Sequence, residues 1–348
     1  MSGREPGAQQ LLIQEVAAKY ARLNTPILAT LELTYRCNLK CGHCYNDRLE
    51  NDELTLDEWK EVLPQLKAAG IIFLTFTGGE ILLEPDMLAT VRYARDSGFR
   101  VGLLTNCTLV TLDIARAIAE LEPFSVVTSL YGVTAATHES VTGVPGSFEA
   151  TLQGIRLLVG AGLVPIVQTV GMNSNLEELP RIKELVAQLG ADSTIYLEMT
   201  PSRSGSGYPL EYEPDFTGLV NCGIPPDSFG SRSKEGKLLC QAGKSSCSIS
   251  PSGDVYPCVL FPLKLGNIRQ TSFDSMWRLE PCAELRYLRS MRRSDLYACS
   301  ECELSAYCKR CTGVAYLESG CVNGPSPSAC RQAQKRWRLT QATEVKSC

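Results

Sequence analysis

Between residues 27 and 199, short apolar runs of strand length alternate with longer stretches in which apolar residues recur at helical spacing. This pattern predicts strands that alternate with helices. Short continuous apolar runs such as "IIFLTFT" are typical of strands buried on both faces of a parallel sheet. Between them lie longer stretches with helical spacing, and one has clear boundaries: Thr55 and Glu58 match a capping box, and Gly70 ends the stretch. The expected strands are 27–33, 71–77, 100–106, 124–132, 164–170 and 193–199, and the expected helices 54–70, 85–98, 112–121, 147–162 and 175–190.

This alternation predicts an α/β fold, a partial (β/α)6 parallel barrel with its helices outside. In such barrels the functional site lies at the carboxyl ends of the strands. After Pro201 the pattern breaks into a polar, turn-rich stretch and then a cysteine-dense tail, where metal ligation is expected to supply much of the fold. The expected division is an N-terminal helix (1–26), the barrel (27–202), a linker or loop (203–237), and a cysteine-rich domain ending in a helix (238–348).

Composition and charge exclude several classes of protein. The 348 residues suit one large and one smaller domain, and the net charge of -4 gives no reason to expect a nucleic-acid partner. The basic stretch 278–338 is interpreted as a solvated or cluster-balancing surface, because no platform of aromatic residues accompanies it. The start "MSGREPGAQQ" lacks the apolar core of a signal peptide, and no apolar run is long enough to span a membrane. We therefore expect a cytoplasmic protein without a membrane partner.

Sixteen cysteines but only two histidines, His43 and His138, favour sulfur-rich metal or redox chemistry. The stretch "TYRCNLKCGHCYN" places Cys37, Cys41 and Cys44 directly after the first expected strand. Three thiolates leave one iron of a [4Fe–4S] cluster open for another ligand. Zinc with His43 as a fourth ligand, and inert free thiols, are the alternatives.

A second signal, "FTGGE", follows the second expected strand. Gly78 and Gly79 allow a ligand to approach the backbone closely, and Glu80 can accept a hydrogen bond from an ammonium group. Alone, this sequence could equally be an ordinary turn. Its position one helix after the three-cysteine loop makes it a strong indication of a binding site.

Together these motifs resemble the radical S-adenosylmethionine (radical SAM) superfamily over about residues 27–200. The resemblance implies that Cys37, Cys41 and Cys44 hold a [4Fe–4S] cluster whose open iron binds S-adenosylmethionine, with Gly78, Gly79 and Glu80 near its amino group. Reductive cleavage would then give a 5′-deoxyadenosyl radical that abstracts hydrogen, and the protein would position and shield it.

The same resemblance implies further cofactor contacts, and the sequence departs from the family pattern at two positions. Asn106 and Ser129 match strand-end positions that often touch the cofactor, although each could be a polar cap of its strand. Where relatives often carry an arginine, Thr142 is the nearest residue, and Ile81 replaces the usual proline after Gly-Gly-Glu.

The cysteine spacing of the tail resembles the SPASM domain over about residues 238–335. That resemblance implies two auxiliary [4Fe–4S] clusters, which serve a structural or an electron-transfer role. A zinc knuckle is the alternative, and Cys321 could compete for a ligand position. The implied ligands are Cys240, Cys247, Cys258 and Cys311 for one cluster, and Cys299, Cys302, Cys308 and Cys330 for the other.

Five cysteines remain unassigned. Cys107, which stands where relatives often have glycine, is interpreted as a small buried apolar residue, and the terminal Cys348 as inert. The other three, one of which is the possible competing ligand, are Cys222, Cys282 and Cys321.

The SPASM resemblance implies oxidative modification of a peptide or protein side chain. A porphyrin side chain is the alternative substrate, for which Arg203 is a candidate propionate partner, and a non-catalytic iron–sulfur or zinc sensor is the third hypothesis. Val259 stands where sulfatase-maturing relatives carry an aspartate base, so formylglycine formation is disfavoured. Glu198 is a candidate base or a barrel-wall ion pair, and Tyr35 a candidate relay or a packing residue.

Two partners besides the substrate are expected. The first is an electron donor such as flavodoxin or ferredoxin. The second follows from the short segment before the first strand, which has no room for a leader-peptide recognition domain, so a separate leader-recognition protein is expected for a substrate that has a leader.

Overall fold

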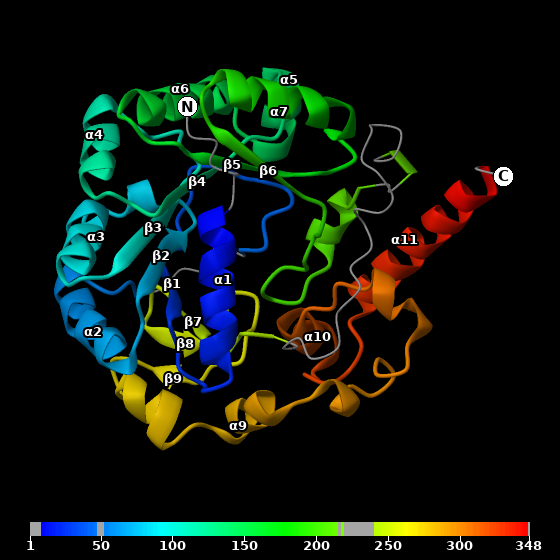
Figure 1. The fold of residues 1–348 in the computed structure, drawn as a ribbon. Helices are drawn as coiled ribbons and strands as arrows, with labels where there is room; N and C mark the ends of the chain where they lie inside the picture. The colour runs from blue at the N-terminus through cyan, green and yellow to red at the C-terminus, as the bar shows by residue number, and fades with distance from the viewer. Residues whose placement is uncertain (1–7, 47–51, 215–216, 219–239, 347–348) are drawn as a thin grey trace.

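The computed structural model describes residues 8–46, 52–214, 217–218 and 240–346. Parallel strands of the expected barrel lie side by side in chain order and curve, and helices cover the outside of this curved sheet (Figure 1). The strands are β1 (Leu28–Thr34), β2 (Phe73–Gly78), β3 (Arg100–Leu104), β4 (Ser125–Ser129), β5 (Ile166–Val170) and β6 (Asp192–Tyr196). The helices are α1 (Ala8–Ala21), α2 (Leu56–Ala69), α3 (Met87–Asp96), α4 (Leu112–Glu120), α5 (Ala135–Thr142), α6 (Ser147–Gly160) and α7 (Leu179–Gln188).

The parallel α/β architecture and the six expected strands are confirmed. Helix α2 begins with the expected capping box, because Thr55 accepts a hydrogen bond from the Glu58 N–H while the Glu58 side chain bonds back to Thr55. It ends at Gly70 in the left-handed conformation (φ +102°). Helix α5 was not expected from the sequence, since it is short and its mixed polar composition hides any helical period.

The cysteine-rich tail continues the barrel sheet. Its strands β7 (Ser246–Ile249), β8 (Asp254–Tyr256) and β9 (Gly266–Asn267) extend the order to β6-β5-β4-β3-β2-β1-β7-β8-β9. Strand β7 pairs in parallel with β1, and Ile249 and Trp277 of the tail belong to the same buried core as Leu31 of β1. The tail therefore gains stability from sheet hydrogen bonds and apolar packing as well as from any metal it binds.

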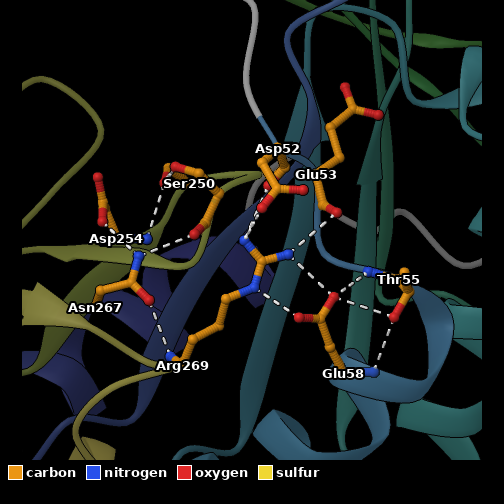
Figure 2. A network of polar contacts seen from close by, with 9 residues as sticks. Asp52, Glu53, Thr55, Glu58, Ser250, Asp254, Asn267 and Arg269 are labelled. Atoms are coloured by element: carbon orange, nitrogen blue, oxygen red, sulfur yellow. Dashed lines mark hydrogen bonds and ion pairs between the residues drawn. The ribbon is translucent and has the colours of Figure 1, made fainter.

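An arginine fastens the tail to the first helix of the barrel (Figure 2). Arg269, two residues after β9, pairs with Glu58 at 2.6 Å and with Asp52 at 2.9 Å. The tail then continues through α9 (Ala283–Ser290), α10 (Thr312–Ser319) and the C-terminal helix α11 (Pro327–Lys346). Within the described residues, no helix combines the length and the apolar character that a membrane span requires.

Strand register separates an outer face from an inner face. Leu31 aligns with Phe76 and Phe76 with Leu103, and all three are fully buried in the core beneath the helices. The alternate positions point to the inside of the curved sheet, because successive side chains of a strand face opposite sides. Several of these inner positions keep partial exposure, which indicates open space inside the barrel. They include Thr30, Thr75, Leu104, Val127, Ser129, Gln168 and Val170.

Candidate active site

The three-cysteine loop leaves the carboxyl end of β1, and all three thiols are partly buried. The carboxyl end of helix α5 holds this loop through backbone hydrogen bonds. The Lys40 N–H donates to the Thr142 carbonyl at 2.7 Å and the Gly42 N–H to the Val141 carbonyl at 3.1 Å. Thr142, the residue nearest the expected cofactor-binding arginine, instead has its hydroxyl against Ser147 at 2.7 Å. Its contribution to the site is therefore the support of the loop.

Gly78 and Gly79 bring the end of β2 directly against the cysteine loop. A Cβ atom on Gly78 (φ +150°) would lie 2.1 Å from the Thr34 carbonyl oxygen, and one on Gly79 would lie 2.2 Å from the Arg36 carbonyl oxygen. The Gly79 N–H also donates to the Thr34 carbonyl at 2.7 Å. The two glycines are required here by the approach of chain to chain, a reason that the sequence alone did not reveal.

Glu80 is fully buried, and its carboxylate takes hydrogen bonds from the chain itself. It accepts from the Thr105 hydroxyl at 2.6 Å, the Asn106 N–H at 2.6 Å and the Leu82 N–H at 3.1 Å. Burial raises the pKa of Glu80, and the three donors act against that rise. The contacts fix the end of β3 beside β2, while a bond from Glu80 to a cofactor ammonium stays a prediction.

Asn106 lies beside Cys37, the first cysteine of the loop. Its side-chain amide lies 4.0 Å from the Cys37 sulfur and donates to Asn38 at 2.9 Å. The next residue, Cys107, has φ +64°, the left-handed conformation that glycine adopts most easily. Cys107 is also completely buried, as expected. Ser129 lies further round, on the inner face at the end of β4.

The first four tail cysteines assigned together are neighbours in space. Burial raises the pKa of the Cys258 thiol to about 12, and the nearby Cys240 and Cys311 thiolates raise it further. Burial likewise raises the pKa of Cys247, with Cys258 as the second cause. Buried thiols of this kind stay protonated unless a cation compensates the thiolate charge. The set therefore fits a cationic iron–sulfur core, and binding by these residues stays a prediction.

The second tail set is brought together in the same way. Burial raises the pKa of Cys308, and Cys330, Cys299 and Cys302 add to the effect. Cys321 is exposed and is not among the thiols that shift the pKa values of this set. Among the residues that the structure describes, no three candidate ligands surround one point closely enough to hold a single metal ion.

Glu198 lies just beyond β6 and pairs with two cations of the tail. Its carboxylate is 2.5 Å from the Lys309 ammonium and 3.4 Å from the Arg336 guanidinium, whose side chain is only 1% exposed. These are the contacts of the ion-pair alternative, and they join the barrel wall to α11. A role for Glu198 as a base stays a prediction.

A buried ion pair inside the barrel was missed by the sequence reasoning. Glu32 on β1 is fully buried, and one of its oxygens accepts from the Arg203 guanidinium at 2.6 Å and from the Tyr35 hydroxyl at 3.3 Å. Arg203, the candidate propionate partner, is thus already paired inside the protein, and Tyr35 is its neighbour. The one signal in the sequence was the acidic residue within the otherwise apolar strand "ILATLEL".

Comparison with known proteins gives the class to which this geometry belongs. Residues 31–186 match the model of the radical SAM superfamily, and residues 240–312 match that of an iron–sulfur cluster-binding domain, SPASM. An AdoMet-dependent heme synthase of Methanosarcina barkeri is 31% identical, over 86% of this chain and 95% of its own. The subtilosin biosynthesis protein AlbA of Bacillus subtilis is 29% identical, over 82% of this chain and 67% of its own.

Among solved structures, Streptococcus suis SuiB bound to the precursor peptide SuiA aligns with a TM-score of 0.70 at 17% identity, covering 95% of this chain and 82% of SuiB. This likeness shows the shared fold. With the sequence matches, it establishes that the chain belongs to the radical SAM superfamily and carries a C-terminal SPASM domain. The protein is accordingly a radical SAM enzyme, a class that binds S-adenosylmethionine and iron–sulfur clusters.

Proposed function

We propose that this enzyme oxidatively modifies a side chain of a peptide or protein substrate. The observation that carries the proposal is the character of the inner barrel face. On the carboxyl half of the strands, the inner positions are hydroxyl, amide or apolar residues, and Glu32, the one charged residue among them, is paired with Arg203. Such a surface suits the amide groups and neutral side chains of a peptide.

A porphyrin with several propionate groups would require cations around it. On the inner face of the described strands the basic position is Arg100, at the amino end of β3 and far along the strand from the cysteine loop. Arg36, next to Cys37, already pairs with Glu53 and Glu84, each at 3.0 Å. These pairings disfavour a carboxylate-rich ligand at the mouth of the barrel.

The porphyrin reaction remains the second candidate because of one specific observation. The heme synthase of Methanosarcina barkeri is 31% identical over nearly its whole length. AlbA, named for the biosynthesis of a bacteriocin, and a mycofactocin maturase of Mycobacterium tuberculosis are 29% and 28% identical. Overall identity does not separate the two substrate classes, so the proposal rests on the lining of the site.

The proposal includes one [4Fe–4S] cluster in each cysteine set. Cys37, Cys41 and Cys44 would hold the cluster that binds S-adenosylmethionine, near Gly79 and Asn106, and the eight tail cysteines would hold the other two. When bound, the cofactor supplies the carbon radical that removes hydrogen from the substrate. The chain positions the groups through the short contacts of Gly78, Gly79 and Glu80, and it shields them inside the barrel.

The test uses protein purified without oxygen, reconstituted with iron and sulfide, and reduced with dithionite in the presence of S-adenosylmethionine. One reaction contains a displayed library of random peptides, and another contains a porphyrin that carries propionates. We expect 5′-deoxyadenosine above background only with the library, together with peptides that have lost two hydrogen atoms. Porphyrin-dependent 5′-deoxyadenosine and a changed porphyrin absorption spectrum would establish the second candidate instead.

A matched control separates both from a non-catalytic protein. The triple variant Cys37→Ala/Cys41→Ala/Cys44→Ala should lose about four irons per chain, keep the rest and form no 5′-deoxyadenosine. Zinc in the tail of the wild type, or 5′-deoxyadenosine from the triple variant, would contradict the assignment of the cysteine sets.

A further inference from the structure

Arg203 contacts four residues that belong to three parts of the chain. Its backbone N–H donates to the Tyr45 carbonyl at 3.0 Å. Its guanidinium donates to the Val259 carbonyl through two nitrogens, each at 3.1 Å, to Glu32 at 2.6 Å and to the Tyr35 hydroxyl. One residue at the end of the barrel therefore joins β1, the cysteine loop and the tail.

Three of these partners, Tyr35, Tyr45 and Val259, lie within two residues of a cluster ligand of the proposed function. Tyr35 stands two residues before Cys37, and Tyr45 directly follows Cys44, so Arg203 contacts both ends of the three-cysteine loop. Val259 directly follows Cys258 of the first auxiliary set.

The contacts of Arg203 are buried and charge-assisted. The Arg203 side chain is 14% exposed and that of Glu32 is fully buried, and the guanidinium lies over the rings of Tyr35 and Tyr45, 5.1 and 5.8 Å from their centres. Guanidinium donates through a planar fork that lysine cannot reproduce. A buried pair of this kind adds little net stability, and in some proteins it instead specifies one arrangement of the groups around it.

We propose that Arg203, held by Glu32, is a positioning residue that fixes the three-cysteine loop relative to the auxiliary loop of Cys258. The inference rests on the proposed function, in which substrate oxidation needs the radical site and an electron-accepting auxiliary cluster at a fixed separation. The electron-transfer rate falls as that separation grows, and a misplacement of reacting groups by about 1 Å can lower the rate of the chemical step about 100-fold. Val259 cannot supply an acidic group here, and its backbone carbonyl serves as the anchor instead.

The test compares Arg203→Met with Arg269→Met in reduced, iron-loaded protein. Arg269 is a suitable control because it also fastens the tail to the barrel through several bonds, but outside the barrel at the start of α2 (Figure 2). The readout is the magnetic coupling between the reduced first cluster and the auxiliary clusters in electron paramagnetic resonance spectra. We expect Arg203→Met to change this coupling and Arg269→Met to leave it as in the wild type.

Turnover gives a second readout that a general loss of stability would not mimic. With a substrate in hand, Arg203→Met should lower kcat at least tenfold while KM stays within about threefold, as expected when only the geometry of the reacting groups is lost. Unchanged coupling in Arg203→Met, or an equal change in both arginine variants, would overturn the proposal.

Two conservative variants keep the test decisive if Arg203→Met does not load iron. Arg203→Lys keeps a charge opposite Glu32 but lacks the planar fork that donates to the Val259 carbonyl and the Tyr35 hydroxyl together. Glu32→Gln keeps the shape but loses the charge. Each variant should give an intermediate change in coupling. Wild-type coupling in both variants would refute the role of Arg203. The coupling is measured without turnover, so a wild type that cleaves no S-adenosylmethionine would reject the proposed function and leave this result interpretable.

Discussion

Helix α6 contains two glycines that should respond in opposite ways to alanine. Alanine normally stabilises a helix by up to about 1 kcal/mol relative to glycine. At Gly160, where a Cβ atom would meet nothing within 4 Å, we expect part or all of that gain. At Gly154 the new Cβ atom would lie 2.1 Å from the Cys107 carbonyl oxygen and 2.9 Å from the Cys107 Cβ.

The contact at Gly154 is more than 1 Å too short, and the opposing atom is backbone, so the loop that follows β3 must move. Overpacking of this kind costs about 1–3 kcal/mol. At the upper end of that range, the cost exceeds the gain of up to about 1 kcal/mol from the higher helix propensity of alanine. Because Cys107 already has a left-handed backbone and adjoins Asn106, the displacement should also weaken cofactor binding beside Cys37. We expect Gly154→Ala to be less stable than Gly160→Ala by roughly 1–3 kcal/mol.

The assay is chemical unfolding of the two iron-loaded variants and the wild type without oxygen, followed by titration with S-adenosylmethionine monitored by the spectrum of the reduced first cluster. Gly160→Ala should match or exceed the wild type in stability and bind the cofactor equally well. Equal stability of the two variants would show that the loop at Cys107 yields freely, and the argument from close approach would then be wrong.

Three further predictions concern the ion pairs and the tail. Glu198→Gln should lower stability by about 1 kcal/mol because the buried Arg336 loses a charged partner, yet leave the formation of 5′-deoxyadenosine and of modified peptide unchanged. A large loss of modified peptide in protein that still binds iron would make Glu198 a base. The hydrogen bond from Arg269 holds the pKa of Glu58 at about 2, below its unfolded value, so this contribution is complete above about pH 4.5 and is lost as the pH falls towards 2. The thermal midpoint of the wild type should therefore decline more steeply with acid over that range than that of Arg269→Met, and parallel curves would contradict the pairing. Cys321→Ser should retain all the iron of the wild type, and a loss of about four irons would make the exposed thiol a ligand.

The sequence by itself determined the order of elements and the class of chemistry. Apolar runs of strand length between helical stretches can bury their surface only in a parallel sheet covered by helices, and the cysteine spacing with Gly-Gly-Glu was sufficient to indicate the radical SAM and SPASM modules. The boundaries of α2 were also readable, because a capping box and a terminal glycine act within a few residues of chain. Such interactions join residues that are close in the sequence, so the sequence alone predicts them.

Only the tertiary structure decided which distant residues meet. The pairing of β7 with β1, the burial of Glu32 against Arg203 and the support of the cysteine loop by α5 each join segments far apart in sequence. Such contacts depend on strand register and on how the sheet curves, which no local pattern specifies. For the same reason Gly78 and Gly79 looked like a ligand cradle in the sequence, while the fold shows a second cause, the passage of the backbone at Thr34 and Arg36 within 2.2 Å of where their side chains would begin.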